Sequence, residues 1–324
     1  MTKIGSQITL RTRGIIVFLC LVAVSLFCQT ADGSEQRTFP LINDPRDAPV
    51  MAIRVNGIET TAMLDTGATI ALIDDEYLSE SQPLVLSNEA TRVLGLGGLR
   101  EYPVTTLCEL TIGARSWKDL RVAVNTSDQF PVRHSIIPMS LFPSSIVDFE
   151  FSKSRVHIYN SRPKRVRGAA SSTIRYDNHH RLVFIPIRIN KVRGLALIDT
   201  GAVRSFVNPA FARQARAVPD AYEQERMQGS DLSRQTAHIH TFRDFRLGDF
   251  RISRTRIPVL GTDLFHELGH GDTPMMVMGM DFLNHFRLQV DQRRQRVTFV
   301  HSATRNRPGP VRFRSGRLEE MLDR

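Results

Sequence analysis

The tripeptide Asp-Thr-Gly occurs twice in the chain, at Asp65–Gly67 and at Asp199–Gly201. Each copy follows an apolar run, Ala62–Leu64 in the first case and Ala196–Ile198 in the second, as is typical of a buried strand. The glycine after each Asp-Thr pair allows a tight turn and a close approach of other backbone. The pattern predicts two aspartates, each held on a rigid backbone at the edge of a core.

Two such units facing each other would bring the carboxylates of Asp65 and Asp199 close enough to share one proton, because two like charges at that distance cannot both ionise. One carboxyl is then a general acid and the other a general base, and a water molecule between them can hydrate an amide carbonyl. We expect Thr66 and Thr200 to hydrogen-bond across to the opposite unit. Since water is the nucleophile, no cofactor and no metal is expected at this site.

The two tripeptides belong to an internal repeat. Residues 50–56 lead into the first copy and residues 184–190 into the second, and the two stretches superpose without a gap. Later anchors follow in the same order, ending with Ile137–Met139 in the first copy and Met278–Met280 in the second. A duplication explains this order.

Each copy consists of short apolar runs with period-two alternation, separated by turn residues, which predicts a β-rich structure. One short helix is expected near the end of a copy, around Asp281–Phe286 in the second. The equivalent stretch of the first copy contains Pro143 and is a weaker helix candidate.

The chain resembles the retropepsin-like aspartic peptidases, the bacterial ones in particular. Leu64–Thr69 and Ile198–Ala202 look like the catalytic motif of that family. Val277–Leu283 looks like its second signature, a hydrophobic-hydrophobic-Gly strand that packs behind the catalytic loop. Leu94–Gly98 is similar to the glycine-rich flap that closes over bound peptide, and the resemblance therefore assigns a flap or substrate role to Gly95, Leu96, Gly97 and Gly98.

The resemblance implies an all-β fold with two tandem retropepsin-like (acid protease) β-barrel lobes and a cleft between them. It implies an aspartic endopeptidase that acts on peptides or proteins, with Asp65 and Asp199 as catalytic residues and Thr66, Gly67, Thr200 and Gly201 supporting the active-site loops. One chain supplies both units, so we expect activity as a monomer. A non-catalytic peptide-binding module on the same fold is the alternative.

Two positions depart from the family pattern. Pro138 stands where the signature of the first copy expects glycine, so the packing behind Asp65 can differ from that behind Asp199. The second copy has no Gly-Leu-Gly-Gly sequence, and Met227–Ser230 is the nearest stretch. The sequence therefore predicts only one glycine-rich flap.

Ala68 and Ala202 follow the two glycines, where pepsin-type enzymes typically carry a hydroxyl residue. Loss of a hydrogen bond to the charged form raises the pKa of a carboxyl group. We therefore predict activity at mildly acidic pH rather than only at strongly acidic pH.

The segment His266-Glu267-Leu268-Gly269-His270 matches the HExxH pattern of zinc peptidases, in which two histidines one helical turn apart bind the metal and the glutamate is the general base. Glycines and a proline break the required helix at once. The spacing between the two copies also increases between Gly248 and Met278, so the motif falls in an insertion. A zinc metallopeptidase using His266, Glu267 and His270 is thus a less favoured hypothesis.

Residues 1–31 read as a targeting segment. Positive charges precede an apolar run at residues 14–28, which is shorter than the ~20 residues of a membrane-spanning helix and fits a signal peptide. We expect an exported protein, periplasmic or extracellular, and the alternative is an uncleaved membrane tether through residues 14–28. The remaining boundaries are predicted as a linker at 32–46, lobes at 47–160 and 181–302, a basic linker at 161–180 and a basic tail at 303–324.

Composition narrows the other possibilities. With 41% hydrophobic and 23% charged residues, the chain of 324 residues can bury proper cores. The formal net charge of +10 comes largely from basic runs that lack interleaved aromatic residues, so no nucleic-acid partner is expected. Cys108 is the one cysteine outside the targeting segment, and we predict a buried structural thiol rather than a nucleophile.

Overall fold

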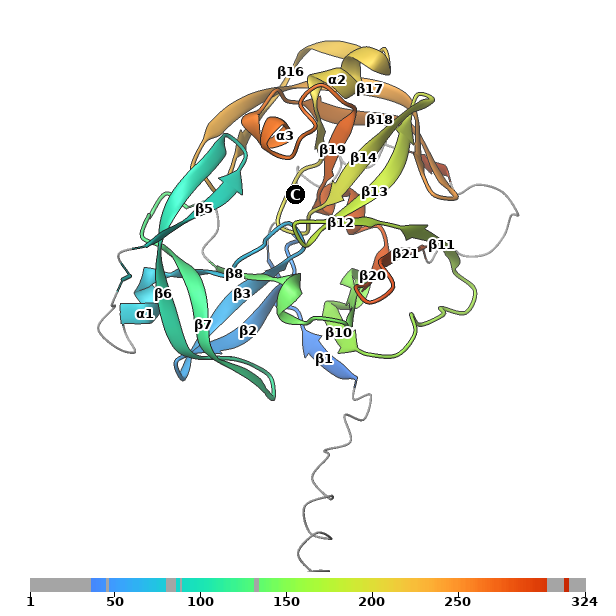
Figure 1. Ribbon diagram of the computed structural model, residues 1–324. Coiled ribbons are helices and arrows are strands. Elements are labelled where there is room, and N and C mark those ends of the chain that lie inside the picture. Colours follow the sequence, from blue (N-terminus) through green and yellow to red (C-terminus); the bar gives the residue numbers. More distant parts are fainter. Residues whose placement is uncertain are drawn as a thin grey trace, which may run out of the picture. The chain divides into compact units, whose positions relative to one another are not determined.

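The computed structural model of the protein describes residues 36–44, 47–79, 86–87, 89–130, 134–301 and 312–314 (Figure 1). These lie in the unit formed by residues 36–324, which is distinct from residues 1–35. The predicted targeting segment and most of the predicted basic tail fall outside the described residues. Over the part that is described, no helix combines the length and apolar character needed to span a membrane.

The first half of the chain forms a seven-stranded sheet, lobe 1. β2 pairs with both β3 and β6, which closes the sheet on itself. Side chains of this sheet alternate between buried and exposed positions, so one face of the sheet packs into a hydrophobic core. Leu64, Leu107 and Phe142 are among the fully buried members of that core. In spatial order the strands are β2 (Val50–Val55), β3 (Ile58–Asp65), β8 (Ser135–Pro138), β4 (Leu72–Asp74), β7 (Arg115–Asn125), β6 (Gly98–Ile112) and β5 (Ala90–Gly95).

The second half forms the corresponding sheet of nine strands, lobe 2. The extra pairing between β13 and β17 closes this sheet in the same way as β2 and β6 close the first. In spatial order the strands are β12 (Asp177–His179), β13 (Leu182–Ile189), β14 (Val192–Ile198), β19 (Met275–Met278), β15 (Phe206–Val207), β18 (Phe250–Val259), β17 (Arg234–Leu247) and β16 (Val218–Gln228), with β22 (Arg312–Arg314) beside β18.

A third, six-stranded sheet takes three strands from each half. β9 and β20 pair at its centre in an antiparallel register, with Asp148 opposite Gln289. Arg287 of the second half makes two 2.7 Å hydrogen bonds to the fully buried carboxylate of Asp148 in the first half. The strand order is β1 (Arg37–Pro40), β10 (Arg155–Tyr159), β9 (Ile146–Glu150), β20 (Arg287–Asp291), β21 (Arg296–His301) and β11 (Ala170–Arg175).

Glu150 contributes to this shared sheet a carboxylate that stays ionised at low pH. Burial alone would raise its pKa, but hydrogen bonds from Lys153, Arg155 and His157 outweigh that effect and lower the pKa to about 2. Because the pKa is depressed, the ion pairs of Glu150 stabilise the fold above its ordinary pKa and are lost only as the pH falls towards 2. The joint between the two halves therefore keeps this charge in mildly acidic solution.

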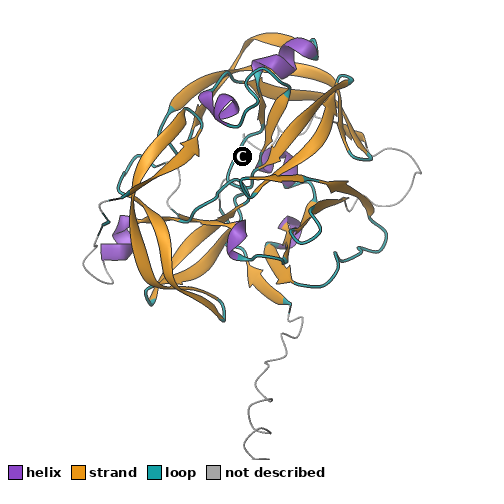
Figure 2. Ribbon diagram, in the orientation of Figure 1, coloured by secondary structure: helices purple, strands orange, loops and turns teal. Residues whose placement is uncertain are grey.

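Within the described residues, helices are few and short (Figure 2). The helix expected around Asp281–Phe286 is present as α4 (Met280–Leu283), and the first copy has only a 3-10 turn at Met139–Leu141 in the equivalent place. The others are α1 (Asp75–Ser79), α2 (Pro209–Gln214) and α3 (Asp263–Glu267). The prediction of an all-β fold with two barrel-like lobes is confirmed.

Two local expectations differ from the structure. The segment predicted as a basic linker, 161–180, contains the strands β11 and β12; β11 pairs with β21 along its whole length, a long-range partner that local periodicity does not reveal. The prediction of a buried thiol at Cys108 is wrong. Leu107 and Leu110 supply the buried side chains of this part of β6, and Cys108 lies on the exposed side.

Candidate active site

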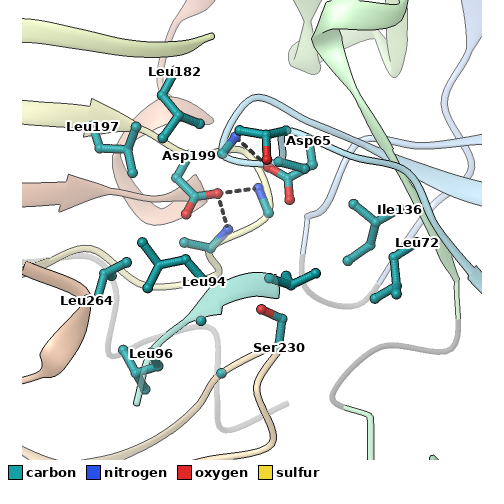
Figure 3. A pocket seen from close by; sticks show the side chains of 18 of the residues that line it. Asp65, Leu72, Leu94, Leu96, Ile136, Leu182, Leu197, Asp199, Ser230 and Leu264 are labelled. Carbon is teal, nitrogen blue, oxygen red and sulfur yellow. Dashed lines mark hydrogen bonds between the residues drawn. The ribbon is translucent and has the colours of Figure 1, made fainter. Parts of the chain in front are cut away.

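The two Asp-Thr-Gly turns lie at the ends of equivalent strands. β3 ends at Asp65 and runs parallel to β8, and β14 ends just before Asp199 and runs parallel to β19. Both strands are buried along their last residues, because apolar side chains occupy the positions before each aspartate. The two strand ends converge, and Figure 3 shows the carboxyl groups of Asp65 and Asp199 side by side at the floor of a pocket.

The threonines brace the two turns against each other as predicted. Thr66 Oγ1 donates to the carbonyl oxygen of Ile198 (2.8 Å) and accepts from the backbone N–H of Thr200 (3.0 Å). Thr200 Oγ1 donates to the carbonyl oxygen of Leu64 (2.8 Å) and accepts from the backbone N–H of Thr66 (3.1 Å). Both threonines are buried, so these four bonds satisfy backbone groups that water cannot reach.

Each glycine of the tripeptides permits the opposite aspartate to approach. A Cβ atom built on Gly67 would lie 2.7 Å from Cγ of Asp199, and one on Gly201 would lie 2.7 Å from Cγ of Asp65. Ordinary Cβ contacts are considerably longer, so only glycine fits at either position. The backbone of one lobe thus forms part of the wall around the carboxyl group of the other.

The two carboxyl groups differ in their hydrogen bonds. Asp65 Oδ1 accepts one bond within its own turn, from the N–H of Gly67 (2.6 Å). Asp199 Oδ1 accepts two, from the N–H groups of Gly201 (2.9 Å) and Ala202 (3.0 Å). Backbone donors stabilise the ionised form at both positions, but the interaction between the two side chains lowers the pKa of Asp199 and raises that of Asp65, so charge is favoured on Asp199.

The pKa values follow this difference. Burial and the adjacent charge of Asp199 raise the pKa of Asp65 well above its ordinary value, and burial also raises the pKa of Asp199. Because each carboxyl group influences the ionisation of the other, the two titrate as a pair and share one proton over part of the pH range. The pair can therefore hold one acid and one base at the same time.

A cleft of about 1150 Å³ opens above the pair and is lined by both lobes. Of the predicted flap, Gly95 and Leu96 line it directly. Most of the wall is apolar, which suits the side chains of an extended peptide. The apolar lining includes Met63, Leu72, Leu94, Phe130 and Ile136 from lobe 1 and Leu182, Leu197, Phe206, Met227 and Leu264 from lobe 2.

Two hairpins, not one, cover this cleft. The predicted flap is the turn between β5 and β6, and lobe 2 has an equivalent turn between β16 and β17. The prediction of a single glycine-rich flap is correct for the residue content of the two turns. The second hairpin nevertheless forms, without a glycine-rich sequence. It lies at Met227–Ser230, the stretch that the sequence comparison named as nearest to the first flap, and Gly229 follows Gly95 by the same interval that separates Asp199 from Asp65.

The two hairpin turns are in contact. The N–H of Gly97 donates to the carboxylate of Asp231 (2.7 Å), and the Tyr102 hydroxyl donates to the carbonyl oxygen of Ser230. Leu96 is 7% exposed and packs with Phe265 of lobe 2. The hairpins therefore meet each other over the cleft.

The supports behind the two Asp-Thr-Gly loops differ, as Pro138 suggested. In lobe 2 the N–H of Gly279 donates to the Ser205 hydroxyl (2.8 Å), which itself donates to Asp281. A Cβ atom on Gly279 would lie 2.5 Å from the carbonyl oxygen of Ala202, so the loop rests directly on this glycine. In lobe 1, Pro138 lies opposite Asp65 in the parallel register and has no N–H to donate.

The HExxH segment does not form the helix that zinc binding requires. α3 ends at Glu267, and Gly269 adopts a left-handed φ of 77° before His270. Nδ1 of His270 is hydrogen-bonded to Thr273 instead (2.9 Å). Within the described ranges, no group of three His, Cys, Asp or Glu side chains is arranged to hold a metal ion.

The insertion that contains α3 lies against the hairpin of lobe 1. α3 contacts β5 and β6, the hairpin of the opposite lobe, and Figure 1 shows α3 close to β5. Leu264, Glu267 and Leu268 line the cleft. The insertion is thus a wall of the cleft, a role that the motif itself does not suggest.

Comparisons with known proteins agree with this architecture. A family model described as aspartyl protease matches residues 51–141 and 185–282, which together are more than half of the chain. Among solved structures, an aspartic proteinase from Irpex lacteus is similar, with a TM-score of 0.55 and 12% identity, over 83% of this chain and 98% of that one. No curated protein matches the sequence. The chain belongs to the aspartyl protease family, as a retropepsin-like protease with two repeated units.

Proposed function

We propose that the protein is an aspartic endopeptidase that hydrolyses peptide bonds with a water molecule activated between Asp65 and Asp199. The observation that carries this proposal is the pair of carboxyl groups, one from each lobe, each of which lies against the glycine turn of the opposite lobe and lines the same cleft. Peptide or protein substrates fit the apolar, two-sided cleft.

The unequal hydrogen bonds favour one division of roles. Asp199, with two backbone donors, is the ionised member and general base. Asp65, whose pKa burial and the neighbouring charge raise well above its ordinary value, is the protonated member and general acid. Environments that push two carboxyl pKa values apart are what acid–base pairs of this kind require.

The reaction follows from these roles. Asp199 takes a proton from water while the water oxygen attacks the peptide carbonyl carbon, and Asp65 gives its proton to the carbonyl oxygen. The product is a neutral tetrahedral gem-diol, and the pair has exchanged its protonation state. Transfer of a proton from Asp199 to the amide nitrogen and return of a gem-diol proton to Asp65 accompany cleavage of the C–N bond. No covalent enzyme intermediate forms.

The hairpins assist by enclosing the reacting centre. When both turns cover a bound peptide, bulk water is excluded and the hydrogen bonds at the centre become stronger. The contacts between Gly97 and Asp231 and between Tyr102 and Ser230 join the hairpins across the cleft. Substrate entry then requires these contacts to break, as is common for enzymes with lids.

The pH range of activity follows from the pair. Catalysis needs one proton on the two carboxyl groups, and both pKa values are raised by burial. The singly protonated pair therefore persists to less acidic pH than an ordinary aspartate would allow. We propose a maximum at mildly acidic pH, and a rate profile that rises only at strongly acidic pH would contradict it.

Substitution of each aspartate tests the proposed function. Asp65→Asn and Asp199→Asn should each abolish cleavage of a mixed peptide library monitored by mass spectrometry. Asp249→Asn, which changes an exposed carboxylate outside the cleft, is the matched control and should cleave like the wild type. Thermal unfolding of all four proteins verifies that the variants are folded.

The other outcomes identify the alternatives. Peptide binding without cleavage by the wild type at any pH would favour a non-catalytic peptide-binding module. Activity that is lost with a chelator or in His266→Ala, but kept in Asp199→Asn, would favour the zinc hypothesis. Activity that survives in both aspartate variants would overturn the proposal altogether.

Location and assembly belong to the same proposal. The apolar run at residues 14–28 supports export to the periplasm or the outside of the cell, with or without retention as a tether. Because each carboxyl group comes from a different half of one chain, the site is complete without a second copy, which supports an active monomer.

A further inference from the structure

Each hairpin over the cleft carries an arginine at the same place. Arg92 lies on β5, three residues before Gly95, and Arg226 lies on β16, three residues before Gly229. Arg226 follows Arg92 by the same interval that separates the two aspartates. The repeat therefore relates the two arginines as it relates the two carboxyl groups.

Both arginines line the cleft with exposed side chains. Neither guanidinium has an ion-pair partner among the described residues. A third arginine of the cleft, Arg204, is neutralised in contrast: it pairs with Glu225 at 2.8 Å and with Asp281 at 3.6 Å. The two related arginines are thus available to a ligand, whereas Arg204 is not.

The other charges of the cleft leave it basic away from the dyad. Arg181, in the turn between β12 and β13, is exposed and lines the cleft. Glu225 is held by Arg204, so Glu267 on α3 is the one lining carboxylate that remains outside the dyad without an ion pair among the residues described. A peptide with negative side chains is favoured electrostatically over a positive one.

We propose that the substrates carry acidic side chains on both sides of the scissile bond, one bound by Arg92 and the other by Arg226. This inference rests on the proposed function. The repeat assigns the two guanidiniums to opposite hairpins, one on each side of the pair formed by Asp65 and Asp199. A guanidinium binds a carboxylate through two parallel hydrogen bonds, which gives both attraction and orientation.

The apolar lining of the cleft defines the rest of the preference. Leu94 and Met227, two and one residues further along the hairpins, line the cleft together with Leu197. The substrate class is therefore a peptide with apolar residues next to the cleaved bond and Asp or Glu further out on each side. At mildly acidic pH, peptide carboxylates with pKa values of about 4 are largely ionised, so this recognition operates while the dyad is singly protonated.

Matched peptides provide the test. A series with a fixed apolar centre carries one Glu, moved through the flanking positions on either side, and a second series carries Gln at the same places. For the wild type we expect kcat/KM to be about tenfold higher for Glu than for Gln at one position on each side, through KM. Arg92→Gln should remove the preference on one side only, and Arg226→Gln on the other.

The controls use other arginines. Arg243→Gln removes an exposed guanidinium that lies on β17 and does not line the cleft, and it should leave the Glu-to-Gln ratio at every position unchanged. Arg92→Lys and Arg226→Lys keep the charge but lose the paired donors, so they should retain part of the preference. Loss of preference in Arg243→Gln, or equal ratios in wild type, Arg92→Gln and Arg226→Gln, would overturn the inference.

A binding measurement separates this inference from the proposed function. Fluorescence anisotropy with Asp199→Asn protein gives Kd for fluorescein-labelled Glu and Gln peptides without turnover. If the wild type cleaves peptides but neither kcat/KM nor Kd favours Glu, the inference fails and the proposed function stands. If nothing is cleaved but Kd favours Glu in an Arg92- and Arg226-dependent manner, the proposed function fails and the acidic ligand class stands.

Discussion

The hairpins of the two lobes occupy equivalent places, but they are not copies of each other. The turn of lobe 1 is Gly95-Leu96-Gly97-Gly98, whereas that of lobe 2 has a single glycine followed by Ser230 and Asp231. Asp231 takes the position of Gly97 in the repeat, and the two residues are hydrogen-bonded to each other. Glycine lets the backbone come close, and the carboxylate supplies the acceptor, so the contact depends on the difference between the halves.

The two Asp-Thr-Gly loops likewise share some features and differ in others. Across the joint between the lobes, Thr66 and Thr200 make reciprocal bonds of nearly equal length. Behind the loops, lobe 2 uses a polar network around Ser205, while lobe 1 has Ala71 and Pro138 at the corresponding positions. The groups at the joint have stayed alike, and those behind it have diverged.

The equivalence of the two Asp-Thr-Gly turns, where the lobes meet, is tested most strongly by Gly67→Ala and Gly201→Ala. Either new methyl group would displace the opposite aspartate, and misplacement of catalytic groups by about 1 Å can cost about 100-fold in rate. We expect both variants to lose at least that much kcat/KM in a peptide assay. Gly261→Ala, where the Cβ would lie 3.4 Å from Pro209, is the control and should remain active.

The unequal hydrogen bonding of the two aspartates is tested by the pH dependence of stability. Because the pKa of Asp65 is raised above 3.8 in the fold, the folded protein binds more protons than the unfolded chain, and stability falls as the pH rises. Asp65→Asn removes that penalty, so its stability relative to wild type should grow by up to about 1.4 kcal/mol per pH unit above 3.8 and level off once the pH passes the raised pKa.

Urea unfolding at several pH values measures this effect. The free energy of unfolding of Asp199→Asn should increase less with pH, relative to wild type, since the two N–H donors already stabilise the charge at that position. Equal gains would show that the two aspartates share the penalty equally, and the division of acid and base roles would then lose its support.

The symmetry of the threonine bonds is tested by Thr66→Val and Thr200→Val. Each change leaves a buried carbonyl and a buried N–H of the opposite lobe without a partner, which we expect to cost about 2–4 kcal/mol in unfolding free energy. The two losses should be similar. Thr→Ser at the same positions keeps the hydroxyl and should retain most of the stability, and a much larger loss in one lobe would refute the equivalence.

The divergence behind the loops is tested by Ser205→Ala, with Ala71→Ser as its mirror. Ser205→Ala leaves the N–H of Gly279 without its acceptor and removes a donor from Asp281, so we expect a loss of about 1–3 kcal/mol. Ala71→Ser should bring no gain, because Pro138 has no N–H. A stabilising Ala71→Ser would show that lobe 1 retains the polar support in another form.

The smallest expected effect concerns the contact between the hairpins. Asp231→Ala removes the acceptor for Gly97 N–H, and hydrogen exchange of that amide should become about tenfold faster. Asp231→Asn keeps an acceptor oxygen and should exchange more slowly than Asp231→Ala. Unchanged exchange in Asp231→Ala would mean that the other contacts alone keep the hairpins together.

The sequence predicted the features that depend on local pattern. Asp65 and Asp199, their flanking strands and the first flap could be located because each has a recognisable residue order that occurs in register with the repeat. The second hairpin was not predicted as a flap, although its position at Met227–Ser230 was identified, because only Gly229 of its turn is a glycine. The strand β11 and the pairing of β9 with β20 depend on partners far away in the chain, about which local periodicity is silent. Cys108 was misplaced because neighbouring leucines already fill the core side of β6.

The contact between Gly97 and Asp231 has a consequence for how such a molecule can evolve. If two identical subunits met at these turns, every change would appear twice, and aspartates at both positions would face each other with like charge. In a fused chain, one codon can mutate while its counterpart is conserved. Selection can then alter the residues of one hairpin and leave those of the other, and the pair of aspartates, untouched.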